Sequence, residues 1–297
     1  MDSQILNALC AAASEIHDLM KAGKGLTLVG ERNATGDRQL ELDIVADSIL
    51  VKHLSGLEQM RFIASEERED LIRTGEGKFS ITLDPLDGSK AAMFGIPPGT
   101  IFGLFRDVDS LDDLHGANVV ASGFFVYGAA LELFFADEGG YQAMILNPDK
   151  GEWEARDIPA TLPSAAVLAL NAANIPEWEL WFQRYYEAQI ASAGNGGEAT
   201  NLRWFGSMVS DVKRLLLQGG LFGYPRRNAP GYENGHLRLI YEAIPMAFLV
   251  EKAGGQSSDG RDSLLNAKAK TLHQKTPVFL GEANKITELE KTAGKKR

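Results

Sequence analysis

The chain has 297 residues, of which 44% are hydrophobic and 24% charged, as is typical of a globular protein with ample material for a core. Its net charge of −10 argues against nucleic acid or an anionic membrane as the main partner, although a few bound divalent cations would still admit a phosphorylated ligand. The single cysteine, Cys10, excludes an intramolecular disulfide and a cysteine-based metal cluster.

The first segment of the chain is predicted to be an amphipathic helix. Apolar residues recur at every third or fourth position from Ile5 to Met20, with Ser3 as the expected N-cap and Cys10 on the buried face. The same segment lacks the features of a secretory signal, so we expect a cytoplasmic protein. The other elements expected in the first half are a helix over residues 40–54, strands over 61–65 and 79–83, and further strands from 99 to 158.

One apolar stretch, residues 116–136, comes closest in composition to a membrane span. It contains Asn118 and Glu132, and Gly123 and Gly128 interrupt its β-rich runs. We therefore interpret it as two buried strands.

Pro159 and Pro163 flank a short polar segment that we interpret as the boundary between an N-terminal half, residues 1–160, and a C-terminal half, residues 161–297. Strands and helices alternate after this boundary, which predicts a layered α/β fold. The strands expected there cover residues 167–170, 221–224 and 278–280, and the helices cover 177–188, 207–218 and 239–253.

The strand over residues 79–83 leads into an unusual turn, Asp84-Pro85-Leu86-Asp87, in which two carboxylates lie close together. Like charges at this range repel each other, so both stay ionised only beside a positive charge or in contact with water. Asp-Pro and Asp-Gly are also ordinary turn formers, and the turn taken alone fits that simpler interpretation.

Other acids follow the same pattern. Glu66 and Glu67 come directly after another strand, while Asp37 and Asp43 bracket the start of a helix. Because ligands of α/β proteins bind where loops converge at the carboxyl ends of strands, we expect the four acids that follow the two strands, Glu66, Glu67, Asp84 and Asp87, to share one crevice. Carboxylate oxygens suit hard cations such as Mg²⁺ or Mn²⁺. Asp47, one turn beyond Asp43, is interpreted as a surface acid.

The turn also offers groups that would bind a phosphate. The backbone carbonyl of Leu86 points into the loop, and Gly88 and Ser89 present N–H groups at an expected helix start. Metal ligands beside a phosphate cradle are the arrangement of a phosphohydrolase.

Longer segments match a known family across almost the whole chain. They are NATGDRQLELD, ASEE, LDPLDGS followed by GTIFG, the NAAN turn, LRWFGSMVSDVKRLLLQGGLFGYP, LRLIYEAIPMAFLVEKAGG and LHQKTPVFLG. In them the chain resembles class I fructose-1,6-bisphosphatase, within the lithium-sensitive phosphatase superfamily that includes inositol monophosphatases. Tyr241-Glu242 stands where inositol phosphatases carry Trp-Asp, which favours a sugar bisphosphatase. At Asn174 and Trp204 the chain resembles the proteobacterial branch of the family.

The resemblance implies a role for each matching residue. The metal ligands would be Asp37, Glu66, Asp84, the Leu86 carbonyl, Asp87 and Glu242. The catalytic residues would be Asp43 and Glu67, which polarise the attacking water, together with Asp37. The 1-phosphate would bind to Asp87, Gly88, Ser89 and Lys90. The sugar and the 6-phosphate would bind to Asn171, Asn174, Tyr224 and His236, with Arg203 reaching in from a neighbouring subunit.

The resemblance further implies the fold and the reaction. The fold would stack helix and sheet layers in the order αβαβα, in two halves. The reaction would be hydrolysis of the 1-phosphate of fructose 1,6-bisphosphate in gluconeogenesis or Calvin-type carbohydrate metabolism, by a homotetramer holding two or more Mg²⁺ or Mn²⁺ ions per subunit. Sedoheptulose 1,7-bisphosphate is an alternative substrate. A non-catalytic sugar-phosphate binder is an alternative of another class.

Three departures from the family's pattern carry expectations of their own. The run DGSKAAM replaces a DGSSN-type run, so Lys90 either helps to hold phosphate or points to solvent while its backbone N–H serves. His236 replaces a Lys or Arg, and because histidine loses its charge near neutral pH, KM is expected to rise between about pH 6 and 8. The chain begins about where the family's second helix does, and Phe79 replaces a tyrosine, so AMP inhibition is expected to be weak or absent.

Overall fold

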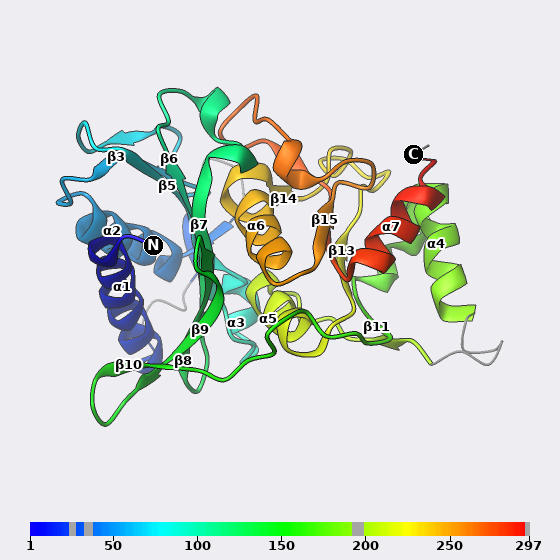
Figure 1. The fold of residues 1–297 in the computed structure, drawn as a ribbon, viewed down its shortest axis with the longest axis horizontal. Helices are drawn as coiled ribbons and strands as arrows, with labels where there is room; N and C mark the ends of the chain where they lie inside the picture. Colours follow the sequence, from blue (N-terminus) through cyan, green and yellow to red (C-terminus); the bar gives the residue numbers. More distant parts are fainter. Residues whose placement is uncertain (24–27, 33–37, 192–198, 295–297) are drawn as a thin grey trace.

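The computed structural model of the chain describes residues 1–23, 28–32, 38–191 and 199–294 (Figure 1). Its helices and sheets stack in five layers along the long axis of the molecule, and the order αβαβα expected above is confirmed. The outer layer at the N-terminal end contains α1 (Ser3–Lys21) and α2 (Glu41–Leu54), the middle layer α5 (Met208–Gln218) and α6 (Ile244–Lys252), and the outer layer at the C-terminal end α4 (Leu180–Ala191) and α7 (Ala283–Thr292).

The larger sheet, between the first and the middle helix layers, has the strand order β10-β9-β8-β7-β6-β5-β3-β4. Its neighbouring strands are antiparallel except β3 and β5, which are parallel, so the carboxyl ends of these two strands meet at one edge. The strands are β3 (Met60–Ser65), β4 (Ile72–Arg73), β5 (Phe79–Asp87), β6 (Gly99–Arg106), β7 (Val119–Tyr127), β8 (Leu131–Asp137), β9 (Gly140–Asn147) and β10 (Glu152–Ala155).

The smaller sheet has the order β12-β11-β13-β17-β15 and lies between the middle and the last helix layers. Its strands are β11 (Val167–Ala169), β12 (Asn201–Leu202), β13 (Leu221–Tyr224), β15 (Gln256–Ser258) and β17 (Val278–Gly281). Two further strand pairs join β1 (Leu28–Arg32) to β2 (Arg38–Leu40) and β14 (Leu237–Arg238) to β16 (Lys275–Thr276). The short helices in the described ranges are α3 (Ser89–Ala92), 3₁₀ turns at Leu111–Asp113, Gly116–Asn118, Ala172–Glu177 and Leu264–Asn266, and a π-helical turn at Leu239–Ala243 that leads into α6.

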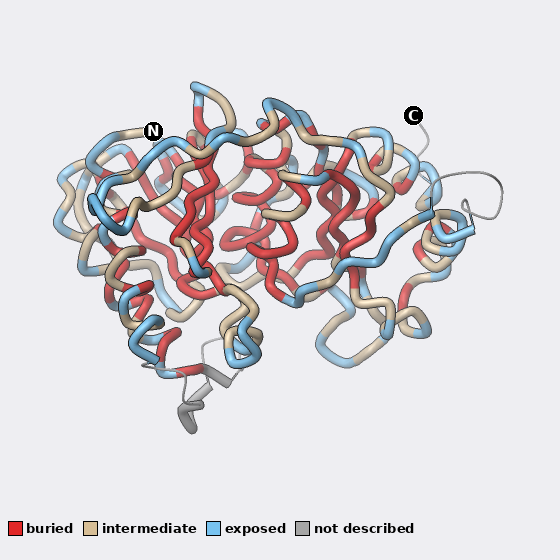
Figure 2. The backbone as a smooth tube through the Cα atoms, turned by 90° about the horizontal axis from the view of Figure 1, so that it is seen from below, coloured by how far each residue is buried: buried red, intermediate tan, exposed pale blue. Residues whose placement is uncertain are grey.

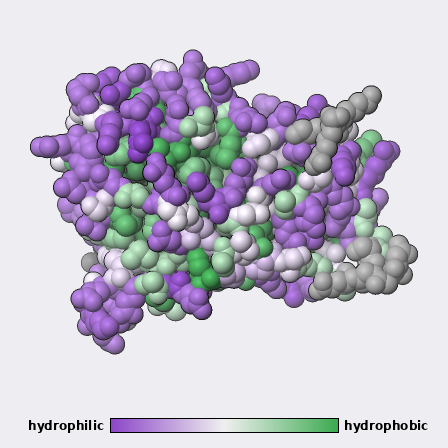
Figure 3. All heavy atoms as spheres, in the orientation of Figure 1, coloured by the Kyte–Doolittle hydropathy of each residue, from purple (hydrophilic) through white to green (hydrophobic). Residues whose placement is uncertain are grey.

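The core follows these layers. Figure 2 shows buried backbone running through the sheets and the middle helices, with exposed segments at the ends of the molecule. On the face drawn in Figure 3, hydrophilic side chains cover most of the periphery and hydrophobic ones gather toward the middle. The stretch 116–136 forms two strands, as predicted, and covers β7 and all but the last residue of β8. In the described part of the chain no helix is long and apolar enough to cross a membrane.

The structure corrects several details of the predicted helices. The N-cap of α1 is Asp2, whose carboxylate accepts the N–H groups of Gln4 and Ile5, and not Ser3. The helix predicted over 177–188 begins at Leu180, because the preceding residues with Pro176 form a 3₁₀ turn. The helix α7 was not predicted, since only Ile286 and Leu289 give it buried apolar positions.

Candidate active site

The predicted acids that lie in the described part of the chain converge on one cavity of about 230 Å³, between the sheet edge and the middle helix layer. The parallel strands β3 and β5 bring their terminal acids to the same edge, α2 contributes an acid from its first turn, and the π-helical turn before α6 contributes another. The predicted site residues that line the cavity are Asp43, Glu66, Glu67, Asp84, Leu86, Asp87, Gly88, Ser89, Lys90, Tyr224, His236 and Glu242.

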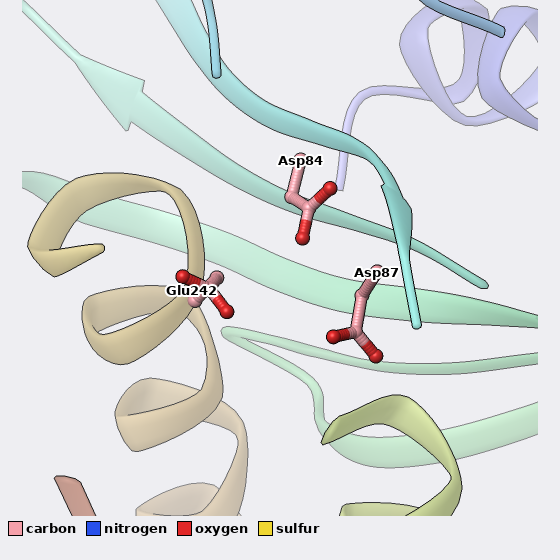
Figure 4. Close-up of side chains that lie close together, drawn as sticks. All are labelled: Asp84, Asp87 and Glu242. Carbon is pink, nitrogen blue, oxygen red and sulfur yellow. The ribbon is translucent and has the colours of Figure 1, made fainter. Parts of the chain in front are cut away.

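Three of these carboxylates form a compact group. Oxygens of Asp84, Asp87 and Glu242 all lie within 4.8 Å of one another, and Figure 4 shows the three side chains facing a common space. Asp84 and Glu242 are only 6% and 5% exposed. Burial, reinforced by the charges of Glu66 and the neighbouring acids, raises the pKa of Asp84 and of Glu242 well above the usual range.

A β-bulge explains how Asp84 and Asp87 come to face the same side. Side chains alternate along a regular strand, so residues three positions apart would point to opposite faces. Here Asp84 pairs with Ile101 of β6 but Asp87 pairs with Gly99, so β5 contains one extra residue at this point. The extra residue brings the carboxylate of Asp87 back to the side on which Asp84 lies.

The start of α5 holds Asp87 in place. Its Oδ2 atom accepts the backbone N–H of Val209 at 2.8 Å and the hydroxyl of Ser207 at 3.3 Å. These bonds favour the charged carboxylate, but burial outweighs them and raises the pKa of Asp87 to about 6. The carboxylate is therefore oriented by neutral donors.

The charge balance of the cavity favours a bound cation. Among the described residues, six carboxyl groups line it, Asp43, Glu66, Glu67, Asp84, Asp87 and Glu242, and the permanent cations are Lys90 and Arg238. Arg238 is 2% exposed, and its Nε atom lies 3.5 Å from Glu66 Oε1. This buried guanidinium therefore offsets part of the negative charge of the cavity. Oxygen donors in this number and this close together fit a hard divalent cation.

Asp43 has the properties of a general base. It is 5% exposed and accepts the backbone N–H of Leu40 at 2.6 Å, which fixes its orientation at the start of α2. Burial raises its pKa to about 6, against the opposing effects of the Leu40 and Ser89 hydrogen bonds and the charge of Lys90. A carboxyl group with a pKa near the operating pH is well suited to accept a proton.

The predicted phosphate turn requires glycine at its centre. Gly88 has φ of 74° and is the N-cap of α3, and a Cβ there would lie 2.6 Å from the Cβ of Ser207. Lys90 is exposed yet lines the cavity, and its charge lowers the pKa of Asp43. Lys90 therefore contributes positive potential to the site even from an exposed position.

The opposite wall of the cavity is aromatic. The ring of His236 stacks between Tyr224 and Tyr232, with centroids 5.3 and 5.0 Å away. Asn171 and Asn174 do not line the main cavity but a small adjoining one, which shares Trp204 and Tyr224 with it.

Arg203, another predicted site residue, does not line the cavity. Arg203 is exposed and donates to the Leu202 carbonyl and to Asn201 Oδ1. Asp37 lies outside the described residues.

Sequence reasoning missed some of the lining and misplaced one acid. Arg238 was missed, although a charged residue within the apolar run LRLIY is a signal of a buried ion pair. Asp47, interpreted above as a surface acid, is 4% exposed, because it faces Arg68 across a tight ion pair. The other lining residues that were not predicted are Ala91, Trp204, Gly206, Met208 and Leu237.

Comparisons with known proteins agree across both halves of the chain. The family described as fructose-1-6-bisphosphatase, N-terminal domain, matches residues 2–157, and the corresponding C-terminal domain matches residues 162–294. The class 1 fructose-1,6-bisphosphatase of Bradyrhizobium diazoefficiens is 35% identical over 96% of this chain and 85% of its own, and the cytosolic enzyme of Solanum tuberosum is 34% identical over 91% and 82%. The holo form of the Leishmania major enzyme superposes with a TM-score of 0.92 at 30% identity, covering 98% of this chain and 94% of that one.

Proposed function

The chain belongs to the class 1 fructose-1,6-bisphosphatase family, and from this membership we propose how its site works. The protein is a phosphatase that hydrolyses fructose 1,6-bisphosphate to fructose 6-phosphate and inorganic phosphate. The observation that supports the assignment most directly is the group of buried carboxylates Asp84, Asp87 and Glu242 beside the glycine-containing phosphate turn.

The family implies a divalent metal cofactor, for which we propose Mg²⁺, with Mn²⁺ as a substitute, in at least two copies per subunit. The side chains proposed to hold it are Glu66, Asp84, Asp87, Glu242 and Asp37, together with the Leu86 carbonyl. When bound, such ions neutralise phosphoryl oxygens, lower the pKa of the attacking water and stabilise the departing sugar alkoxide.

The chain's own groups supply binding and proton transfer. We assign the 1-phosphate to the N–H groups of the turn from Gly88 to Lys90, where a left-handed glycine opens the backbone toward the cavity. Asp43 and Glu67 take up the proton of the attacking water. Burial raises the pKa of Asp43, so this carboxyl group is basic enough to accept the proton near neutral pH.

The sugar and the 6-phosphate are assigned to the aromatic wall, at Tyr224 and His236, with Asn171 and Asn174 in the adjoining cavity. In this assignment the N-terminal half, residues 1–160, carries most of the metal ligands and the phosphate turn. The C-terminal half, residues 161–297, carries the sugar side and adds Glu242.

We propose a homotetramer in the cytoplasm, in which Arg203 of one subunit completes the site of another. The side chain of Arg203 is exposed, and Leu202 and Phe205 beside it are 39% and 43% exposed, which suits a subunit contact. Light scattering of the purified protein would measure the oligomeric state. An Arg203→Ala variant would raise KM without removing the metal.

The test of the function is phosphate release with Mg²⁺ or Mn²⁺ across a panel of substrates. Fructose 1,6-bisphosphate should be the preferred substrate over sedoheptulose 1,7-bisphosphate, and monophosphates should react poorly. The Glu242→Gln variant is expected to lose at least about a hundredfold in kcat, as removal of a metal ligand does at such sites. Binding of fructose 1,6-bisphosphate without any phosphate release would instead support a sugar-phosphate binder.

A further inference from the structure

We propose that Thr100 and Tyr127 are positioning residues that hold the β-bulge of β5 in the shape that the metal ligands require. The proposal deepens the function proposed above and rests on it. Neither residue lines the cavity, and both are buried in the sheet behind it, Thr100 at 0% and Tyr127 at 4% exposure.

The two hydroxyl groups form a chain that ends on the bulge. Thr100 Oγ1 lies 2.7 Å from the Pro85 carbonyl oxygen and 2.6 Å from the Tyr127 hydroxyl. A carbonyl oxygen only accepts, so the single hydrogen of Thr100 is donated to Pro85. The Tyr127 hydroxyl must then donate to Thr100 Oγ1, and the direction of the whole chain is fixed. Burial raises the pKa of Tyr127, so the phenol keeps the proton that it donates.

The bulge explains why the Pro85 carbonyl needs a side chain as its hydrogen-bond partner. Between the Asp84–Ile101 and Asp87–Gly99 pairs the register is interrupted, and Thr100 stands opposite Pro85 and Leu86. A buried carbonyl without a partner is costly, and Thr100 supplies that partner from its side chain.

One peptide unit transmits this contact to the metal site. The carbonyl of Pro85 and the N–H of Leu86 belong to the same planar peptide group. The carbonyl accepts from Thr100, and the N–H donates to Asp84 Oδ1 at 3.0 Å. Both ends of this peptide plane are therefore hydrogen-bonded. Thr100 thus fixes the rotation of the peptide group that orients the Asp84 carboxylate. It also fixes the position of the Leu86 backbone, whose carbonyl is a proposed metal ligand.

Tyr127 is in turn held from outside the sheet. Its ring stacks on His17 of α1 with centroids 6.3 Å apart, and His17 Nε2 lies 2.8 Å from the carbonyl oxygen of Gly128, the next residue in the chain. The hydroxyl chain thus starts from a fixed aromatic group rather than from a mobile one.

The experiment measures Mn²⁺ binding without substrate, by the electron paramagnetic resonance signal of the free ion. Thr100→Val keeps the shape of the side chain and removes the hydroxyl, and it should weaken Mn²⁺ binding about tenfold or more, as is usual when a group that orients a metal ligand is lost. Tyr127→Phe should weaken it about threefold, because Thr100 keeps its bond to Pro85 but loses its own donor. Thr100→Ser keeps both hydrogen bonds and should bind as the wild type does.

A matched control is available on the same sheet. Tyr141 of β9 has a buried hydroxyl with no hydrogen-bond partner among the described residues, so Tyr141→Phe should leave Mn²⁺ binding unchanged. The melting temperature in EDTA separates loss of stability from loss of metal affinity. If Thr100→Ser lost as much affinity as Thr100→Val, the hydroxyl would not be the relevant group.

The proposal would be overturned if Thr100→Val and Tyr127→Phe bound Mn²⁺ like the wild type. If Thr100→Val failed to fold, Tyr127→Phe against Tyr141→Phe would decide the question alone. A wild-type protein that binds Mn²⁺ but releases no phosphate from fructose 1,6-bisphosphate would refute the proposed function and leave this test intact.

Discussion

Arg68 donates to the same carboxylate oxygen of Asp47, Oδ2, from both Nε at 2.8 Å and Nη2 at 2.7 Å. The pair joins α2, whose first turn carries Asp43, to the turn after β3, which carries Glu67. The Arg68 carbonyl also lies 2.9 Å from Nε2 of His273, which attaches this turn to the C-terminal half. One ion pair therefore fixes the two proposed proton acceptors relative to each other.

Breaking this pair should affect stability and catalysis together. Arg68→Met leaves the buried Asp47 carboxylate without its cation, and should lower the free energy of unfolding by about 3 kcal/mol and reduce kcat. A double-mutant cycle with Asp47→Asn should give a coupling energy of about 1 kcal/mol or more. The control pair is Lys52 with Glu15, which joins α2 to α1 at 3.3 Å on the exposed side and should contribute less than about 1 kcal/mol. A coupling of zero between Asp47 and Arg68 would contradict the expectation.

Removing a metal ligand should stabilise the metal-free protein while it abolishes activity. Asp84 is buried among like charges, so Asp84→Asn relieves repulsion that only a cation otherwise balances. We expect the melting temperature in EDTA to rise by several degrees and kcat with Mg²⁺ to fall at least about a hundredfold. The wild-type protein should gain more in melting temperature from Mg²⁺ than the variant does. A variant that melts lower than the wild type in EDTA would indicate that the carboxylates are not strained by one another.

The stability of the metal-free protein should fall as pH rises through the acid range. The pKa values of Asp43 and Asp87 are about 6 in the folded state and close to 3.8 in the unfolded chain, because burial disfavours the charge. Between these values the folded state binds more protons than the unfolded one, so the contribution of these groups is fully present below about pH 4 and is lost as pH passes about 6.

Bound metal should reverse this dependence, because it requires deprotonated ligands. The rise in melting temperature caused by Mg²⁺ should therefore grow from pH 5 to pH 7.5, by several degrees. Differential scanning fluorimetry with Mg²⁺ or EDTA at each pH measures it, and Ca²⁺-free buffers keep the comparison to one ion. An increment that stays constant across this range would show that the acids are already ionised without metal.

The sequence predicted the long-range features of the site better than its local geometry. Acids at the ends of apolar strands pointed to one crevice, because strand direction alone brings Glu66 and Asp84 to the same edge. The bulge that turns Asp87 toward Asp84 could not be predicted, since it depends on how β5 pairs with β6. A strand expected to end at Leu83 in fact continues to Asp87.

Contacts between distant segments were also beyond the sequence pattern. Asp47 has the spacing of a surface acid on α2, and only the approach of Arg68 from the turn after β3 makes its burial tolerable. The same holds for Thr100 and Tyr127. In the sequence they are ordinary strand residues, and only the fold places their hydroxyl groups behind the Pro85 carbonyl. Such partners are found only when both segments are placed in space.

The ring of His236 is held between Tyr224 and Tyr232 on the sugar side of the cavity. An imidazole carries a positive charge only below about neutral pH, so its attraction for the distal phosphate should weaken as pH rises. We expect KM for fructose 1,6-bisphosphate to rise between about pH 6 and 8 while kcat follows the acids of the metal site. His236→Lys keeps a charge throughout and should lower KM at pH 8 by about tenfold, as a hydrogen bond to a charged group does. His236→Gln should hold KM high at every pH.

His53 provides the control for this prediction, because it pairs with Glu15 at 2.9 Å between α1 and α2, on elements that contribute nothing to the sugar side. His53→Gln should leave the pH profile of KM unchanged. A fructose 1-phosphate control tests the assignment further. This substrate lacks the distal phosphate, so its KM should not depend on the charge at position 236 and should be similar for His236→Lys and His236→Gln. If KM for the bisphosphate were independent of pH in the wild type and unaffected by His236→Lys, His236 would not bind the distal phosphate. Another basic side chain near Tyr224 would then have to bind it.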